Sequence, residues 1–271
     1  LIGGMSLALS LLDAGITDVE IFEASSAVKE LGVGINVLPH ATRELTELGL
    51  LDDLAATGIP TAELVYYSKH GQRIWSEPRG TAAGYNWPQF SIHRGELLGL
   101  LHRAVVQRLG ASRVHTASPL ASFDQAAAAV SARFGDRMVE GDILVGADGI
   151  HSVVRRAFYP NEGAPKWNGI TMWRGVTVGK PFLTGRTMAM IGYFQRRFVV
   201  YPISKRHEDR GEALINWVAE TKTEEGRPMP KQDWEYKANV EDTVRPFASF
   251  AFDFLDVPAL IREAEAIYQY P

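Results

Sequence analysis

The chain has 271 residues, a net charge of -4 at pH 7 and no cysteine. This charge balance gives no reason to expect a nucleic acid or a membrane as a partner, and the lack of cysteine excludes disulfides, thiolate zinc sites and cysteine nucleophiles. No apolar run is long enough to predict a transmembrane helix, and no pattern predicts a metal site. We therefore expect a cytoplasmic protein.

The first segment, "IGGMSLALSLLDAG", predicts a buried apolar helix that ends at Gly15. The next predicted element is a strand over residues 19–22 that finishes on Glu23. A glycine-rich helix start followed about 20 residues later by an acid is typical of the second half of a dinucleotide-binding unit. Gly3 and Gly4 would let a pyrophosphate approach the helix N-terminus. A plain helix turn and an exposed strand-end acid are the alternative interpretation.

The middle of the chain alternates glycine-bounded helices with short strands. The pattern predicts a helix from Pro39, stopped by Gly49, and a hairpin around His70 and Gly71. A second helix is predicted over residues 94–109, entered through Ser91 and ended by Gly110. Residues 112–125 and 127–135 are predicted to form strands.

The stretch "ILVGADGIHSVVRR" joins an apolar run to a basic helix through Asp148 and Gly149. A continuous apolar run predicts a strand buried on both faces. Aspartate and glycine at the start of a helix are typical of a site that holds hydroxyl or phosphate groups. An ordinary helix N-cap is the other interpretation of Asp148.

From Gly169 the character of the sequence changes. Four segments rich in aromatic and β-branched residues predict a mostly antiparallel sheet with one face free to bind something flat: "ITMWRGVTV", "RTMAMIGYF", "RRFVVYPIS" and "EALINWVAE". Residues 230–247 are predicted to be helical, and residues 258–271 to form a helix that leads into a strand.

Five segments together carry a family resemblance: "IGGMSLALSLLDAG…VEIFEAS", "LGVGINVLPHATRELTELGL", "SIHRGELLGLL", "DILVGADGIHSVVR" and "ITMWRGV". They resemble the FAD-dependent aromatic hydroxylases of the p-hydroxybenzoate and salicylate hydroxylase type, the group A flavoprotein monooxygenases. "LGVGIN", "IWSEPRG", "PQFSIHRGEL" and "GADGIHS" narrow the resemblance to phenazine hydroxylases, including 5-methylphenazine-1-carboxylate monooxygenases.

The resemblance implies an α/β fold in which two domains are interleaved. A Rossmann-like FAD-binding domain would take residues 1–62 and 88–168. A mostly antiparallel-sheet substrate domain, like that of p-hydroxybenzoate hydroxylase, would take residues 63–87 and 169–271. The resemblance also implies a segment before Leu1 and a Gly-Asp segment after Pro271, so we expect the chain to be truncated at both ends.

The resemblance assigns the cofactor site to a set of residues spread over the chain. Glu23 would bind the adenosine ribose, Arg94 the diphosphate or ribityl chain, and Asp148 the ribityl or ribose hydroxyls. Arg155 or Arg156 would meet phosphate. A surface ion pair is the alternative for Arg94, and a glycine turn for Val33 and Gly34. The implied FAD contacts are Gly3, Gly4, Glu23, Ala24, Val33, Gly34, Arg94, Asp148 and Gly149.

The implied reaction uses NADH or NADPH as co-substrate and molecular oxygen to hydroxylate a small aromatic substrate through a flavin hydroperoxide, in a monomer or homodimer. No catalytic side chain is identified, because the cofactor carries the chemistry. The predicted substrate-lining residues are Met172, Trp173, Arg174, Tyr201, Pro202 and Trp217. Core packing is the alternative for each aromatic, since strand alternation lets only about half face one side.

Two other functions compete with this one. The first is a truncated, non-catalytic remnant of the same fold that binds an aromatic ligand or a partner but no flavin. The second is a related flavoenzyme, such as a halogenase or reductase. Halogenases carry a Trp-x-Trp-x-Ile-Pro segment, which this sequence lacks.

Overall fold

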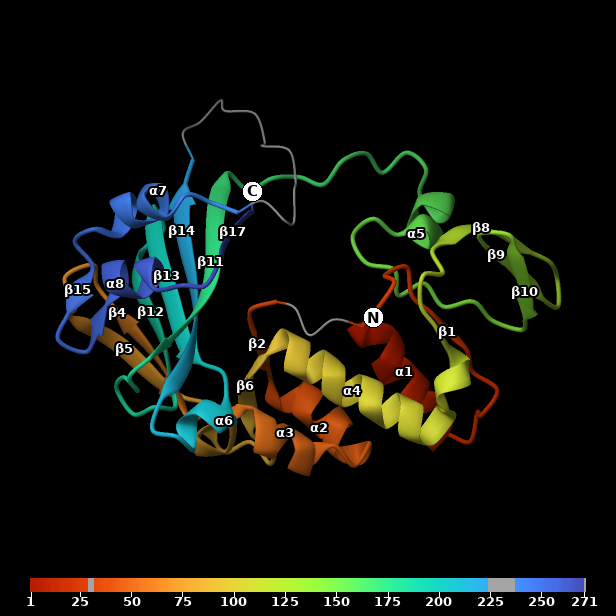
Figure 1. Cartoon of the computed structure of the whole chain (residues 1–271), viewed down its shortest axis with the longest axis horizontal. Coiled ribbons are helices and arrows are strands. Elements are labelled where there is room, and N and C mark those ends of the chain that lie inside the picture. Colours follow the sequence, from red (N-terminus) through yellow and green to blue (C-terminus); the bar gives the residue numbers. More distant parts are fainter. Residues whose placement is uncertain (29–31, 224–236, 271) are drawn as a thin grey trace. The chain divides into compact units, whose positions relative to one another are not determined.

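The computed structural model describes residues 1–28, 32–223 and 237–270 (Figure 1). They form two compact units, each built from two stretches of the chain. Unit 1 comprises Leu1–Glu30 and Leu97–Pro165, and unit 2 comprises Leu31–Glu96 and Lys166–Pro271. Residues 31–62 and 88–96, which the resemblance assigned to the FAD-binding domain, fall in unit 2.

Unit 1 begins with α1 (Ile2–Asp13). The helix ends as predicted at Gly15, which has a φ of +84°. The N–H groups of Gly15 and Ile16 close the last turn by donating to Leu12 O and Leu11 O at 3.0 and 2.9 Å. Fewer side chains of this helix are buried than predicted: Met5, Ala8 and Leu9 are buried, while Leu7, Leu11 and Leu12 are half-exposed.

The strands of unit 1 are short. β1 (Ile21–Phe22) pairs in parallel with β7 (Val114–His115), so the strand predicted over residues 19–22 is only half as long as expected. A three-stranded antiparallel sheet follows, made of β8 (Leu120–Gln125), β9 (Val130–Phe134) and β10 (Arg137–Gly141). The unit also contains the short helices η2 (Ala111–Arg113) and α5 (Val153–Phe158).

The buried strand predicted before Asp148 is wrong. Residues 143–149 carry no regular secondary structure, and the side chains of Ile143 and Val145 are 81% and 54% exposed. A strand forms only where a neighbouring strand accepts its backbone hydrogen bonds. In the described part of unit 1, no strand pairs with this segment.

Unit 2 contains a small antiparallel sheet and the helices beside it. The sheet has the order β2 (Gly34–Val37), β6 (Gln89–His93), β3 (Ile59–Thr61). Ser91 therefore lies in a strand and not at the entrance of α4 (Arg94–Leu109), whose predicted bounds are confirmed. The accompanying helices are α2 (Pro39–Glu47), ended by Gly49 as predicted, and α3 (Leu51–Thr57), with the short helix η1 (Gly80–Ala83) before β6.

A seven-stranded sheet dominates unit 2 (Figure 1). Its order is β17-β11-β14-β13-β12-β4-β5, and the pairing is antiparallel except between β12 and β4. The predicted mostly antiparallel sheet and the hairpin at Gly71 are thus confirmed. The strands are β4 (Glu63–Tyr67), β5 (Arg73–Pro78), β11 (Ile170–Gly179), β12 (Thr187–Tyr193), β13 (Arg196–Pro202), β14 (Ala213–Lys222) and β17 (Ile267–Tyr270).

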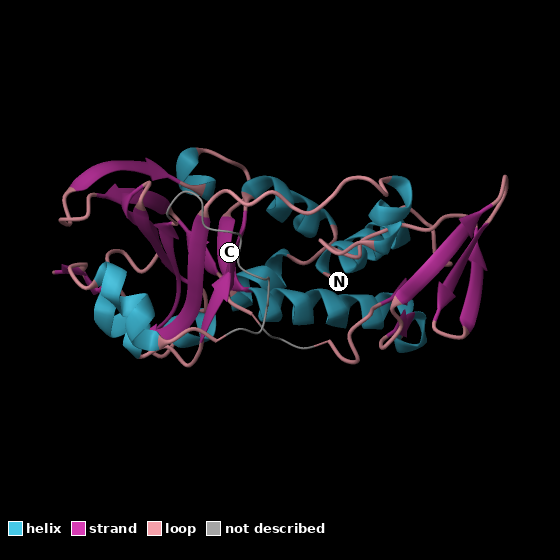
Figure 2. Cartoon of the chain, turned by 90° about the horizontal axis from the view of Figure 1, so that it is seen from above, coloured by secondary structure: helices cyan, strands magenta, loops and turns pink. Residues whose placement is uncertain are grey.

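Helices cover one face of this sheet (Figures 1 and 2). Of the helix predicted over residues 230–247, residues 230–236 lie outside the described part, and the described residues contain α7 (Val240–Val244) and η3 (Arg245–Phe247). The predicted last helix and strand are α8 (Val257–Arg262) and β17. The remaining elements are α6 (Lys205–Glu208), β15 (Ala251–Phe252) and β16 (Leu255–Asp256).

The two faces of the seven-stranded sheet differ in burial. The covered face forms the main core with Phe198, Val200 and Trp217, packed against Phe247 and Ile261 of the helices. Along β12 and β14, buried residues of this face alternate with half-buried residues of the other. We call the second surface the open face.

Among the described residues, no helix is long and apolar enough to cross a bilayer.

Candidate functional site

The start of α1 has the features of an anion site. Among the described residues, no side chain forms a capping hydrogen bond with the first turn of the helix. A Cβ atom at Gly3 would have no neighbour within 4 Å, and one at Gly4 would only touch Ala147 Cβ at 3.7 Å. Packing within unit 1 therefore gives no reason for glycine at position 3, whereas approach of a phosphate does.

The tip of β1 places an acid beside this helix start. The Glu23 backbone N–H donates to His115 O at 2.8 Å, which continues the parallel pairing. The backbone nitrogen of Leu1 lies 3.8 Å from Glu23 Oε2, and Glu23 Oε1 accepts a bond from the Ser25 N–H at 2.9 Å. Ala24 is exposed in the loop that follows. Glu23 thus lies next to the start of α1 within unit 1.

Asp148 has a structural role at the start of α5. Its Oδ2 accepts bonds from the Val153 and Val154 N–H groups at 2.6 and 3.3 Å, while Ser152 is the N-cap and accepts from the Arg155 N–H at 2.9 Å. Burial raises the pKa of Asp148, but hydrogen bonds from Ser152 and from backbone N–H groups outweigh it and leave the pKa below its usual value. The carboxylate is therefore ionised and oriented at neutral pH.

Among the residues that follow Asp148, Gly149 is open to a ligand, whereas Arg155 and Arg156 form local contacts. Gly149 has a φ of +76° and no neighbour within 4 Å of a Cβ position, so its backbone is open to approach. The Arg155 side chain donates to Ile150 O at 2.7 Å and pairs with Glu162 at 2.8 Å. Arg156 Nη2 donates to His151 O at 3.4 Å. The two arginines predicted to meet phosphate are thus engaged locally.

In unit 2 the pairing of β2 with β6 brings the next predicted residues together. Gly34 lies opposite His93, and the Arg94 N–H donates to Val33 O at 3.0 Å. The His93 ring nitrogen Nε2 lies within hydrogen-bonding distance of Gly32 O, at 2.9 Å. The exposed Arg94 side chain extends from the first position of α4.

Gly34 is packed too tightly for any other residue. A Cβ atom there would lie 2.7 Å from Asn216 Cβ and 2.8 Å from Ile203 Cγ2. The Gly34 N–H donates to Asn216 Oδ1 at 2.6 Å, and Gly34 O accepts from Arg174 Nη2 at 2.9 Å. Two hydrogen bonds of Gly34 therefore join strand β2 to Arg174 of β11 and Asn216 of β14 in the large sheet.

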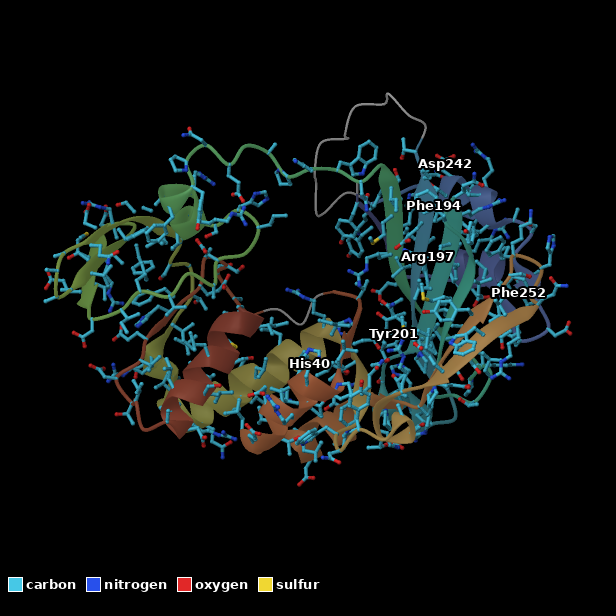
Figure 3. All side chains as sticks on the ribbon, turned by 180° about the vertical axis from the view of Figure 1, so that it is seen from behind. His40, Phe194, Arg197, Tyr201, Asp242 and Phe252 are labelled. Atoms are coloured by element: carbon cyan, nitrogen blue, oxygen red, sulfur yellow. The ribbon has the colours of Figure 1, made fainter. Side chains whose placement is uncertain are left out.

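The open face carries half of the predicted substrate residues. Met172 and Arg174 lie two residues apart on β11 and therefore share one face, and Tyr201 lies on β13 opposite Asn216 of β14. Tyr201 is labelled in Figure 3. Further apolar side chains of this face pack around Val199 and Tyr201, namely Val176, Met188, Met190, Leu214 and Val218. This combination of flat apolar surface and a few polar groups suits an aromatic ligand.

The prediction is corrected for Trp173, Pro202 and Trp217, which lie on the covered face. Trp217 is fully buried in the core, stacks on Phe198 at 5.8 Å and donates to Thr177 Oγ1 at 3.1 Å. Trp173 packs on the same cluster, and Pro202 is buried opposite Ile215. The side chains of alternate residues in a strand point to opposite faces, so these three cannot share a surface with Met172, Arg174 and Tyr201.

The electrostatics of the open face centre on Arg174 and two tyrosines. Burial raises the pKa of Tyr201 to about 12, although the positive charge of Arg174 beside it acts in the opposite direction. Burial also raises the pKa of Tyr270, again against the charge of Arg174. Both phenols are therefore neutral at physiological pH, beside the Arg174 guanidinium.

Two buried donors at this position have no partner among the described residues: Arg174 Nε and Asn216 Nδ2. Buried donors are rarely left unpaired in proteins, so such groups indicate a ligand or water site. Asn216 and Tyr270 were not predicted. In the sequence, Asn216 could have been recognised as the one amide inside the apolar run "ALINWVA". Tyr270 could have been recognised from the alternation in "IYQY".

Comparison with known proteins identifies the family of this site. The sequence profile of the FAD binding domain family matches residues 2–248. The chain belongs to the FAD binding domain family. FAD is thus the cofactor to test against the residues above. The open space at Gly3 and Gly149 and the position of Glu23 beside the start of α1 fit it.

The relatives of the chain are named hydroxylases and monooxygenases. It is 40% identical to phenazine 1,6-dicarboxylic acid hydroxylase PhzS of Lysobacter antibioticus, over 100% of this chain and 68% of that protein. It is 35% identical to 3-amino-4-hydroxybenzoate 2-monooxygenase of Streptomyces cremeus, over 65% of this chain and 44% of that protein. The family assignment confirms the resemblance to FAD-dependent aromatic hydroxylases.

Solved structures show the same fold. Klebsiella pneumoniae HpxO, complexed with FAD and uric acid, superposes with a TM-score of 0.79 at 21% identity, over 99% of this chain and 65% of that one. The 2,6-dihydroxypyridine-3-hydroxylase from Arthrobacter nicotinovorans gives a TM-score of 0.71 at 25% identity, over 99% of this chain and 69% of that one. The chain spans about two thirds of the length of these proteins.

Proposed function

We propose that the protein is an FAD- and NAD(P)H-dependent monooxygenase that hydroxylates a planar aromatic or phenazine-type molecule. The observation that carries the proposal is the open face of the seven-stranded sheet, where Met172, Arg174 and Tyr201 lie together in a member of an FAD-binding family. The name of the Lysobacter relative supports a phenazine acid as the class of substrate.

Each unit by itself carries residues that we propose as FAD contacts. In unit 1, the start of α1 with Gly3 and Gly4 would take the diphosphate, and Glu23 and Ala24 the adenosine ribose. Asp148 would accept hydrogen bonds from cofactor hydroxyls while it also caps α5, with Gly149 leaving room beside it. In unit 2, the residues proposed as contacts are Val33, Gly34 and Arg94. When bound, FAD would take electrons from NADH or NADPH and activate molecular oxygen.

The side chains of unit 2 would orient the substrate and limit the access of water. Met172 and the apolar residues around Val199 supply a flat surface. The phenol of Tyr201 stays protonated, because its pKa is raised to about 12, so it can donate a hydrogen bond without adding a negative charge. We place the enzyme in a reducing cytoplasm, which the absence of cysteine supports.

The test is to purify the full-length gene product and to measure bound FAD, then the oxidation of NADH and NADPH with and without phenazine-1-carboxylate. The proposal predicts a yellow protein with one FAD per chain and oxidation that the aromatic acid stimulates. A protein that takes up no added FAD would contradict it. A protein that binds the aromatic acid and FAD but oxidises neither NADH nor NADPH would support a ligand-binding module instead.

A further inference from the structure

The segment that leads into β11 contains an asparagine followed by a glycine, Asn168 and Gly169. No other asparagine of the sequence precedes a glycine. Asn168 is exposed, and both residues belong to unit 2. An asparagine loses its amide group when the backbone nitrogen of the next residue attacks the side-chain carbon Cγ. Glycine hinders this attack least, because it carries no Cβ atom.

The attacking nitrogen, that of Gly169, donates to no acceptor among the described residues. A Cβ atom at Gly169 would have no neighbour within 4 Å, so the space beside this backbone is open. The φ of Gly169 is +78°, which favours glycine, and Gly169 O accepts from the Thr223 N–H at 2.7 Å. The nitrogen therefore needs neither to break a hydrogen bond nor to displace a packed side chain before it reacts.

The side-chain amide of Asn168 is held in the same turn of the backbone. Its Oδ1 accepts a hydrogen bond from the Ile170 N–H at 3.0 Å, which is the contact of an Asx turn. The ring that this bond closes runs through the Gly169 nitrogen, so the turn holds Cγ and the attacking atom together. Negative charge develops on Oδ1 as the nitrogen adds to Cγ, and a backbone N–H that already points at this oxygen stabilises that charge.

Asn161 provides a comparison within the chain. It is also exposed, but the residue after it is Glu162, whose side chain hinders the attack. The Glu162 N–H donates to Tyr159 O at 3.2 Å, so the nitrogen that would attack is occupied. Of these two exposed asparagines, only Asn168 is followed by an unhindered nitrogen without an acceptor in the described structure.

We propose that Asn168 is a site of spontaneous deamidation. Hydroxide removes the proton of the Gly169 N–H, and the nitrogen forms a bond to Cγ of Asn168. The bond from Cγ to the side-chain nitrogen then breaks, and this nitrogen leaves as ammonia after it takes a proton from water. Water opens the resulting succinimide at either carbonyl carbon, which gives aspartate or isoaspartate. No atom is oxidised or reduced.

Isoaspartate would lengthen the main chain by one carbon atom directly before β11. Two hydrogen bonds lie at this linkage. The Trp167 indole N–H donates to Ile170 O at 2.8 Å, across the modified bond, and the Thr223 N–H donates to Gly169 O at 2.7 Å. Since both depend on the spacing of residues 167–170, the isoaspartate form should unfold at a lower urea concentration than the unmodified protein. This inference is independent of the proposed monooxygenase function.

The test is to incubate the full-length protein at neutral and at alkaline pH and to analyse its tryptic peptides by chromatography and mass spectrometry. Trypsin cleaves after lysine and arginine, so Asn168 lies in the peptide "WNGITMWR" and Asn161 in "AFYPNEGAPK". Each peptide contains one asparagine and no glutamine, so a gain of one mass unit assigns the reaction to that residue.

Two controls accompany the measurement. The Asn168→Ser variant keeps a side-chain oxygen that can accept the Ile170 N–H bond but has no amide group to lose. A sample of the wild-type protein unfolded in urea shows the reaction of the same sequence without the folded turn.

We expect the Asn168 peptide to gain mass at least about tenfold faster than the Asn161 peptide, which corresponds to a barrier lower by about 1.4 kcal/mol. The rate should increase at alkaline pH, the product should include isoaspartate, and the peptide from Asn168→Ser should gain no mass. Three results would overturn the inference: equal rates at the two asparagines, a reaction at Asn168 only in the unfolded sample, or aspartate as the sole product, since direct hydrolysis of the amide gives no isoaspartate.

Discussion

Replacing Gly34 with alanine should destabilise unit 2 by about 2 kcal/mol. The added methyl group would lie 2.7 Å from Asn216 Cβ and Cγ and 2.8 Å from Ile203 Cγ2, and overpacking of this kind costs about 1–3 kcal/mol. If β2 moves away to relieve the contact, the bond from the Gly34 N–H to Asn216 is lost, at a cost of about 1 kcal/mol. Alanine recovers about 0.5–1 kcal/mol through a less flexible unfolded chain.

Urea unfolding followed by tryptophan fluorescence measures this effect selectively. All six tryptophans of the chain belong to unit 2: Trp75, Trp87, Trp167, Trp173, Trp217 and Trp234. The emission change therefore follows the unfolding of this unit, and its midpoint should fall in Gly34→Ala with little change in slope.

A double-mutant cycle separates the steric contact from a general effect at position 34. In an Asn216→Gly background the nearest atoms are gone, so Gly34→Ala should be less destabilising than in the wild type. An unchanged midpoint in the single variant, or an equal loss in both backgrounds, would refute the packing argument for Gly34.

Three further predictions concern the cofactor site and the open face. Gly3→Ala should leave the fold intact or stabilise α1 slightly, because the site is open and helical, while FAD affinity falls; unchanged affinity would count against a phosphate site there. Asp148→Ala should weaken FAD binding roughly 10- to 150-fold, and a loss of folding stability with normal FAD affinity would leave only the capping role. Burial raises the pKa of Tyr201 to about 12. The contribution of its protonated phenol to the free energy of unfolding is therefore complete below about pH 10 and decreases by up to about 2–3 kcal/mol as the pH rises to about 12. The free energy of unfolding of Tyr201→Phe should lack that decrease, and a pH profile identical to that of the wild type would contradict the assignment of this effect to Tyr201.

Local patterns predicted the parts of the fold that local interactions determine. Gly15 and Gly49 end their helices, and the hairpin turns at Gly71, because each needs a positive φ that the sequence signals directly. The segments rich in aromatic and β-branched residues after Gly169 are also a local pattern, and they predicted the mostly antiparallel sheet.

The errors arose where distant segments decide the outcome. The apolar run before Asp148 has no paired strand in the described structure, so Ile143 is exposed. Gly34 donates a hydrogen bond to Asn216, 182 residues away in the sequence, and both lie in unit 2; no local pattern reveals this contact. Trp217 was assigned to the substrate and Asn216 overlooked, since the phase of the β14 alternation depends on which face the helices cover.

The most direct test of the central claim is the incorporation of labelled oxygen. The full-length, FAD-loaded protein would be supplied with ¹⁸O₂, NADH or NADPH and phenazine-1-carboxylate, and the products analysed by mass spectrometry. The account predicts a hydroxylated product that carries one ¹⁸O atom. Oxidation of the nicotinamide that gives hydrogen peroxide and no labelled product, with every aromatic acid offered, would contradict it.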